Sequence, residues 1–234
     1  MNILALDTAM ASCGVAFMRA GAIVAERSLL QSRGHAETLM PLLEEFRHET
    51  GFAYRDLAAI AVTIGPGTFA GIRVGLAAAR AIALPTAAAI VGLTSLEVLA
   101  AEAMERTSPV TTGAVAAITD ARNGKVYLQV VGVDRLTRIE ARLVAIDEAA
   151  RLIDGVAGVL CGDGAPLVAT HLAAPRVIVT RASGDALQPS PRLLALLAAD
   201  AIARRGLSAF RRPPRPLYLR SPDAKLPTER RRPP

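Results

Sequence analysis

The alternation of apolar and polar residues in the first half of the chain predicts an α/β domain. Short apolar segments rich in β-branched residues indicate strands, and longer ones with apolar residues three and four positions apart indicate helices. Three strands come first and are followed by helices and strands in alternation, which favours a mixed sheet. The expected strands cover residues 2–7, 14–19, 22–29, 58–64 and 87–91, and the expected helices cover residues 35–50 and 72–84, with another beginning at the capping box Thr94-Ser-Leu-Glu97.

The second half opens with a pattern similar to that of the first. A strand at residues 114–120 ends on an aspartate, as the strand at 2–7 does, and Asn123-Gly124 favours a hairpin into a strand at 125–131. So short a match is weak evidence of a repeat, and chance also explains it. Further on we expect strands at 156–161 and 176–179 and helices at 166–172 and 191–205. The expected parts are a first lobe at 1–106, a second lobe at 107–212 and a tail at 213–234.

The turn between the strand at 58–64 and the next helix is the most distinctive segment. Gly65, Gly67 and Gly71 allow positive φ angles and close backbone contacts. The first N–H groups of the helix and its dipole suit an anion. The spacing G-x-G-x-x-x-G, however, matches neither the dinucleotide-binding fingerprint nor a P-loop.

Small residues recur every four positions along this helix, at Gly71, Gly75, Ala79 and Ala83. They share one face, where another helix can approach closely. The alternative is a helix that buries this face within its own domain. If the face is open to a partner, Gly75→Leu should separate the two helices and leave the monomer folded.

The charge of the chain is concentrated near its end. Ten of the 27 basic residues lie at or after Arg204, while the rest of the chain is nearly neutral. A tail of this kind is suited to polyanions, but a solvated tail without a partner has the same composition. The cluster Arg230-Arg-Arg232 lies between prolines, and we expect it to be extended because it has nothing apolar to bury.

Composition also bears on the compartment. Cys13 and Cys161 are the only cysteines and form no C-x-x-C, as expected in a reducing cytosol. The N-terminus shows no basic leader, and the longest uncharged run, at residues 81–96, is too short to span a membrane. We therefore expect a cytoplasmic protein with no membrane contact.

Two strand ends carry candidate chemistry. Asp7 and Thr8, together with Ser12 after the turn, are able to face a phosphate, as is Asp120 in the second half. The competing interpretation is that these side chains only hydrogen-bond turn amides. The three histidines lack ligand spacing and no G-x-S-x-G occurs, so neither a metal site nor a hydrolase elbow is expected.

Five motifs in order give the chain a resemblance to the bacterial TsaB (YeaZ) family over essentially its whole length. This family is a subunit of the complex that makes threonylcarbamoyladenosine (t6A) at position 37 of tRNA. The motifs are Asp7-Thr8 with Ser12-Cys-Gly-Val-Ala16, His35-Ala-Glu-Thr-Leu-Met-Pro41, Gly65-Pro-Gly-Thr-Phe-Ala-Gly-Ile-Arg-Val-Gly-Leu76, Thr119-Asp-Ala-Arg122 and Pro216-Leu-Tyr-Leu-Arg220.

The resemblance implies an ASKHA-type fold, that is, two ribonuclease-H-like halves with mixed sheets flanked by helices, the second half reduced. It also implies partners: the catalytic paralogue TsaD, bound through the first two helices, and the ATPase TsaE, with tRNA reached through the assembled complex. A homodimer is conceivable for the chain alone. The matching interface positions here are Leu39, Leu42, Leu43, Phe46, Gly71, Gly75 and Ala79.

The resemblance further implies that this chain is not the enzyme of the complex. TsaD binds metal through an H-x-x-x-H motif, whereas this chain has His35-Ala-Glu-Thr-Leu39. The turns at Asp7 and Asp120 lack the glycine of ASKHA ATPase loops, so these two residues with Thr8 and Ser12 would form a vestigial nucleotide site. No cofactor is expected for the isolated chain, and ATP and a divalent metal are expected in the partner subunits. The rival hypotheses are an autonomous ASKHA ATPase or small-molecule kinase and, less supported, a peptidase.

Overall fold

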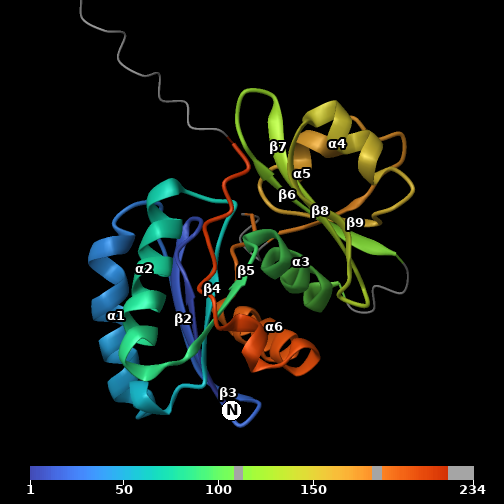
Figure 1. Cartoon of the computed structure of the whole chain (residues 1–234). Coiled ribbons are helices and arrows are strands. Elements are labelled where there is room, and N and C mark those ends of the chain that lie inside the picture. The colour runs from blue at the N-terminus through green and yellow to red at the C-terminus, as the bar shows by residue number, and fades with distance from the viewer. Residues whose placement is uncertain (108–112, 181–185, 221–234) are drawn as a thin grey trace, which may run out of the picture.

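The computed structural model describes residues 1–107, 113–180 and 186–220, arranged around two five-stranded sheets (Figure 1). The first half contains β1 (Asn2–Asp7), β2 (Ser12–Arg19), β3 (Ala22–Leu30), α1 (His35–Thr50), a 3-10 turn at Tyr54–Asp56, β4 (Ala59–Thr63), α2 (Phe69–Thr86), β5 (Ala89–Leu93) and α3 (Ser95–Arg106). The second half contains β6 (Ala114–Asp120), β7 (Lys125–Gly132), β8 (Thr137–Ala145), α4 (Ile146–Ile153), β9 (Val159–Cys161), α5 (Ala165–Ala169), β10 (Val177–Val179), α6 (Pro191–Arg205) and a 3-10 turn at Leu207–Phe210.

The two sheets have the same topology. The strand order is β3-β2-β1-β4-β5 in one sheet and, read in the matching direction, β8-β7-β6-β9-β10 in the other. In each, a central strand pairs antiparallel with the next strand of the chain and parallel with a later one. The faint repeat in the sequence is therefore a true duplication of the ribonuclease-H-like unit. The second copy is reduced, because β9 and β10 have three residues each and α5 has five.

Five layers result from the way the helices cover the sheets (Figure 1). Side chains alternate across β1, so that Leu4 and Leu6 face α1 and α2 while Ile3 and Ala5 face α6. In the second sheet, α4 and α5 cover one face and α3 covers the other. Alternating burial of this kind is expected for strands buried on both faces.

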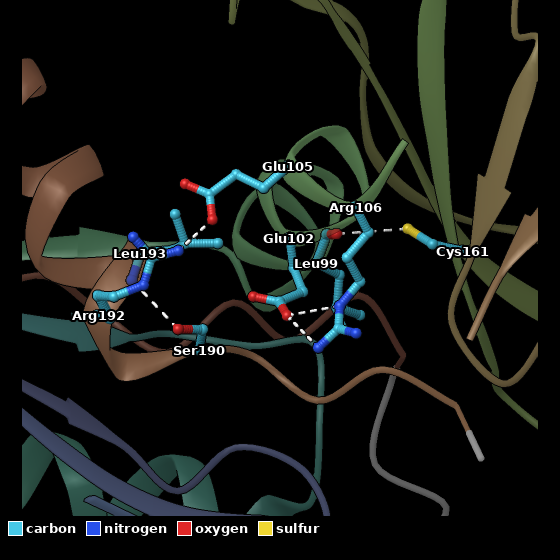
Figure 2. A network of polar contacts seen from close by, with 8 residues as sticks. All are labelled: Leu99, Glu102, Glu105, Arg106, Cys161, Ser190, Arg192 and Leu193. Atoms are coloured by element: carbon cyan, nitrogen blue, oxygen red, sulfur yellow. Dashed lines mark hydrogen bonds and ion pairs between the residues drawn. The ribbon is translucent and has the colours of Figure 1, made fainter. Parts of the chain in front are cut away.

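The two central helices cross between the halves. The sequence-based boundary after residue 106 separates the strands of the two sheets, but α3 packs on the second sheet and α6 on the first. Figure 2 shows their junction, where Arg192 on α6 pairs with Glu105 on α3. Each half thus supplies a helix to the core of the other, and the lobes at 1–106 and 107–212 do not pack as separate units.

Both cysteines are buried thiols within this core. The Cys161 thiol donates to the carbonyl oxygen of Leu99 on α3 over 3.5 Å (Figure 2). Burial raises the pKa of Cys161, and the charge of Glu102 acts in the same direction. Burial likewise raises the pKa of Cys13 to about 11. Both shifts favour the protonated thiol over the thiolate, which is the nucleophilic form.

Most elements match the sequence-based predictions. Helix α1 has the predicted bounds, and the capping box at α3 forms in both directions, with Glu97 N–H donating to Thr94 Oγ1 and Thr94 N–H to Glu97 Oε2. The prediction omitted β8 and α4. Strand β8 lies at the edge of its sheet and alternates charged and apolar residues, with Ile139, Ala141 and Leu143 half-buried. That period of two was the available signal.

By length and composition, α2 is able to cross a membrane, and no other helix in the described ranges is. It carries Arg73 and Arg80 and packs one face on the first sheet. A core helix of a folded domain passes the same test, so this finding does not change the expectation of no membrane contact.

The end of the described chain forms a strap across the first lobe, seen in red in Figure 1. Leu217 N–H donates to Ile64 O over 2.8 Å, and Arg80 on α2 donates to Pro214 O over 2.7 Å. Leu217 and Leu219 are half-buried and Tyr218 is exposed. The cluster at Arg230–Arg232 lies outside the described residues.

Candidate functional site

The Gly-Pro-Gly turn packs directly on the turn between β1 and β2. A Cβ atom added at Gly67 would lie 2.1 Å from Ala9 O, and one added at Gly71 would lie 2.0 Å from Thr8 O. Backbone oxygens cannot be displaced cheaply, so only glycine fits at either position. The glycines of this segment therefore serve to bring two loops of the same chain into contact.

This contact lies at the start of α2, where the sequence analysis considered an anion site. Thr68 N–H donates to Ala9 O over 2.8 Å, and the Thr68 hydroxyl caps α2 by accepting from Gly71 N–H over 3.1 Å. Thr8 Oγ1 donates to Gly71 O over 2.7 Å. Two of the donors at the start of α2, the N–H groups of Thr68 and Gly71, are thus bonded to the chain itself.

Asp7 is fully buried behind this contact. Its carboxylate accepts hydrogen bonds from the hydroxyls of Thr63 (2.6 Å) and Ser12 (3.0 Å) and from Ala9 N–H (3.3 Å). Burial raises the pKa of Asp7 from 3.8 to about 6, and the three hydrogen bonds oppose that rise. Of the two interpretations of Asp7 and Ser12, the geometry favours the turn-forming one. The sequence analysis missed Thr63, whose only signal is a hydroxyl at the end of an apolar strand.

This buried carboxyl makes the stability of the chain depend on pH. A group whose pKa is higher in the folded chain than in the unfolded chain binds more protons when folded, so stability falls as pH rises from about 4 to about 6. A rise from 3.8 to about 6 corresponds to about 3 kcal/mol. Asp7→Asn is neutral throughout and keeps the shape of the side chain. We expect its free energy of unfolding, relative to that of the natural chain, to increase by up to about 3 kcal/mol between pH 4 and 7.

Urea denaturation at several pH values measures this difference. Asp56→Asn, which changes an exposed carboxyl, is the matched control and should give a curve parallel to that of the natural chain. A constant difference between Asp7→Asn and the natural chain would contradict the assignment.

Asp120 occupies a different environment, although it ends the strand equivalent to β1. It lines a cleft of about 420 Å³ between the halves, together with Thr68, Asp163, Gln188 and other residues. Asp120 N–H donates to Asp163 Oδ1 over 2.9 Å, and burial raises the pKa of Asp163, with the charge of Asp120 acting in the same direction. Asp7, Thr8 and Ser12 do not line this cleft, so the four proposed vestigial nucleotide residues do not form one site. The cleft is lined by Arg122 and Arg220 as well as by Asp120 and Asp163, so its charges are mixed.

The seven predicted interface residues lie inside the protomer. Leu39, Leu42, Leu43 and Phe46 of α1 belong to the core beneath the first sheet, as does Ala79 of α2. A Cβ atom at Gly75 would lie 2.6 Å from Thr8 Oγ1. The prediction that these side chains form an open contact face is wrong. The stripe Gly71, Gly75, Ala79 allows α2 to approach the chain's own β1–β2 turn and β4, which is the alternative left open by the sequence.

The exposed side of α2 carries a second stripe of small and apolar residues. Ala70, Ala77, Ala81 and Leu84 are exposed, and Val74 between them is half-buried. Leu84 keeps 87% of its surface accessible. Spacings of four and three residues place these side chains on one helix face, suited to packing against another helix. On the neighbouring α1, Ala36, Met40 and Pro41 are also exposed. We call Ala70, Val74, Ala77, Ala81 and Leu84 the outer stripe.

Comparison with known proteins identifies the family. TsaB of Bacillus subtilis, named for tRNA threonylcarbamoyladenosine biosynthesis, is 33% identical over 127 residues, which are 54% of this chain and 53% of that protein. An uncharacterized protein of Mycobacterium tuberculosis is 31% identical over 233 residues, covering 96% of this chain and 94% of its own. The family model described as TsaD, tRNA N6-adenosine threonylcarbamoyltransferase, matches residues 22–174.

The chain belongs to the TsaB (YeaZ) family. The solved structure of YeaZ from Pseudomonas aeruginosa has the same fold, with a TM-score of 0.77 at 24% identity over 93% of this chain and all of that one. The match to B. subtilis TsaB spans about half of that protein's length. The expected ASKHA-type fold is thus confirmed for this TsaB-family chain, with two mixed sheets flanked by helices.

Proposed function

We propose that this chain is a non-catalytic subunit that pairs with TsaD and supports transfer of the threonylcarbamoyl group to N6 of adenosine 37 in tRNAs that read ANN codons. The observation that carries the non-catalytic role is the contact between the Gly-Pro-Gly turn and the β1–β2 turn. The N–H groups of Thr68 and Gly71, at the start of α2, donate to Ala9 O and Thr68 Oγ1, and the carboxylate of Asp7 is buried behind this contact. No catalytic step is assigned to residues of this chain.

The outer stripe supports the pairing. An exposed row of alanines ending in Leu84 lets a second helix approach closely, and most of its contact energy would come from excluding water from apolar surface. In this proposal α1 and α2 contact TsaD through their outward faces, TsaE joins the pair, and tRNA binds to the assembled cytoplasmic complex. ATP and a divalent metal belong to the partner subunits. In the absence of TsaD the same stripe would pair with a second copy of the chain.

Two measurements test this function. Co-expression with TsaD and TsaE from the same source should give a complex that forms t6A on tRNA, and omission of this chain should abolish or strongly reduce the product. The isolated chain should show no ATP hydrolysis above background and no threonylcarbamoyl transfer. Robust ATP turnover by the isolated chain, lost in Asp7→Ala, would overturn the proposal in favour of an autonomous ATPase or kinase.

A further inference from the structure

Two of the few aromatic side chains of this protein lie exposed against each other. The chain has five Phe and three Tyr and no Trp. Phe69, at the start of α2, is 57% exposed, and Tyr218, in the strap, is 46% exposed. Their rings stack with centroids 5.4 Å apart and an interplanar angle of 29°. The two residues come from segments far apart in the sequence, and their rings are open to solvent. The other aromatic pairs of the described chain both involve Phe52, which is buried.

Arg73 holds this pair in place. Its guanidinium carbon lies 3.6 Å from the centroid of the Phe69 ring, and its Nε donates to the Tyr218 hydroxyl over 3.0 Å. The rings are therefore ordered before any ligand arrives, which reduces the entropy lost on binding. Phe69 and Tyr218 nevertheless keep the exposure given above, so part of each ring remains accessible to a ligand.

The surrounding surface is basic. Arg73 and Arg80 lie on α2, which has no acidic residue, and further arginines lie on and beside the strap. Nine other arginines of the described chain pair with carboxylates. Arg73, Arg80 and the arginines on and beside the strap make no ion pair within the described ranges. We use the name strap patch for the Phe69–Tyr218 pair together with these arginines, which are Arg73 and Arg80 of α2 and Arg211, Arg215 and Arg220 on and beside the strap.

We propose that the strap patch binds a single-stranded segment of RNA, with its arginines on phosphates and one unstacked base on the Phe69–Tyr218 pair. Arginine clusters neutralise phosphates regardless of sequence, and exposed aromatic rings accept the face of any base. A duplex hides its base faces, so only an unpaired nucleotide reaches these rings. The choice of RNA as the nucleic acid rests on the proposed function. The stacking and charge arguments are independent of that function.

Fluorescence anisotropy with the full chain tests this binding. The probes are a labelled single-stranded RNA of about ten nucleotides and the same strand in a duplex, each titrated at about 50 and 200 mM salt. We expect tighter binding of the single strand. Tyr218→Ala should weaken it about fivefold or more with an unchanged salt dependence, since one stacked base is lost.

Arg215→Glu should weaken binding and lower the slope of log affinity against log salt by about 0.7 or more, because at least one phosphate contact is lost. Arg151→Glu, on α4 in the other half, makes the same change of charge at an exposed position and should leave affinity and slope unaltered. Thermal melting establishes that each variant is folded.

Three results would overturn the inference: equal affinity for single strand and duplex, no effect of Tyr218→Ala, or an effect of Tyr218→Ala on TsaD pairing with RNA affinity unchanged. The last would assign the patch to a protein partner. Absence of RNA binding with TsaD pairing intact contradicts this inference alone, whereas failure to pair with TsaD contradicts the proposed function.

Discussion

Gly75→Leu is expected to abolish folding of the chain. A Cβ atom at this position alone would lie 2.6 Å from Thr8 Oγ1 and 3.4 Å from Val62 Cγ2, and a leucine adds three further carbon atoms. Thr8 cannot move aside without breaking its hydrogen bond to Gly71 O. Overpacking of this size against a strand and a turn costs roughly 4 kcal/mol or more, a large share of the roughly 5–15 kcal/mol that stabilises a typical domain.

Thermal melting and the soluble yield measure this effect. Gly158→Leu is a matched control, because a Cβ atom there meets nothing within 4 Å. Ala77→Leu, on the exposed side of the same helix, controls for α2 itself, and both variants should melt within a few degrees of the natural chain. A Gly75→Leu protein that melts with them would show that this face is open after all, as the partner-interface hypothesis first assumed.

Ala77→Glu is expected to leave the chain folded but to prevent its pairing with TsaD. Ala77 is exposed at the centre of the outer stripe, where glutamate is well tolerated in a free helix. In a close helix pair the same carboxylate would be buried without a partner. We expect affinity for TsaD to fall about thirtyfold or more, equivalent to about 2 kcal/mol, with a proportional loss of t6A formation at limiting protein.

Ala203→Glu provides the control for this experiment. It introduces the same charge at an exposed alanine of α6, on the opposite face of the first sheet. Co-purification with TsaD measures the pairing with that partner. Size-exclusion chromatography of the isolated chain measures its pairing with a second copy. If Ala77→Glu pairs with TsaD as well as Ala203→Glu does, the outer stripe is not the contact surface.

The local signals of this chain predicted most of its secondary structure and gave a weak indication of its repeat. The capping box at Thr94 acts within four residues, and the hairpin after each central strand is formed by neighbouring segments. Such features depend on short-range hydrogen bonds and on the period of apolar residues, both of which are visible in the sequence. The same reasoning missed α4 and the edge strand β8, where the available alternation was overlooked rather than absent.

Local patterns did not predict which face of α2 is available to a partner. The helix carries two stripes of small residues, Gly71, Gly75, Ala79 on one side and the outer stripe on the other, and both have the spacing of a packing surface. Periodicity states that a face is suited to close contact but not which partner it meets. The sequence-based choice of the first stripe as the partner interface failed for this reason.

The sequence by itself therefore determined most of the elements and the family, since these follow from neighbouring residues or from motifs, and it gave only a weak indication of the repeat. Only the tertiary structure decided which side of α2 is buried, that Asp7 is enclosed while Asp120 is exposed, and that Phe69 meets Tyr218. The physical reason is that these properties depend on contacts between distant segments, such as the bond from Thr8 to Gly71, 63 positions away. Their geometry is set by how the sheets and helices pack, and no local pattern contains it.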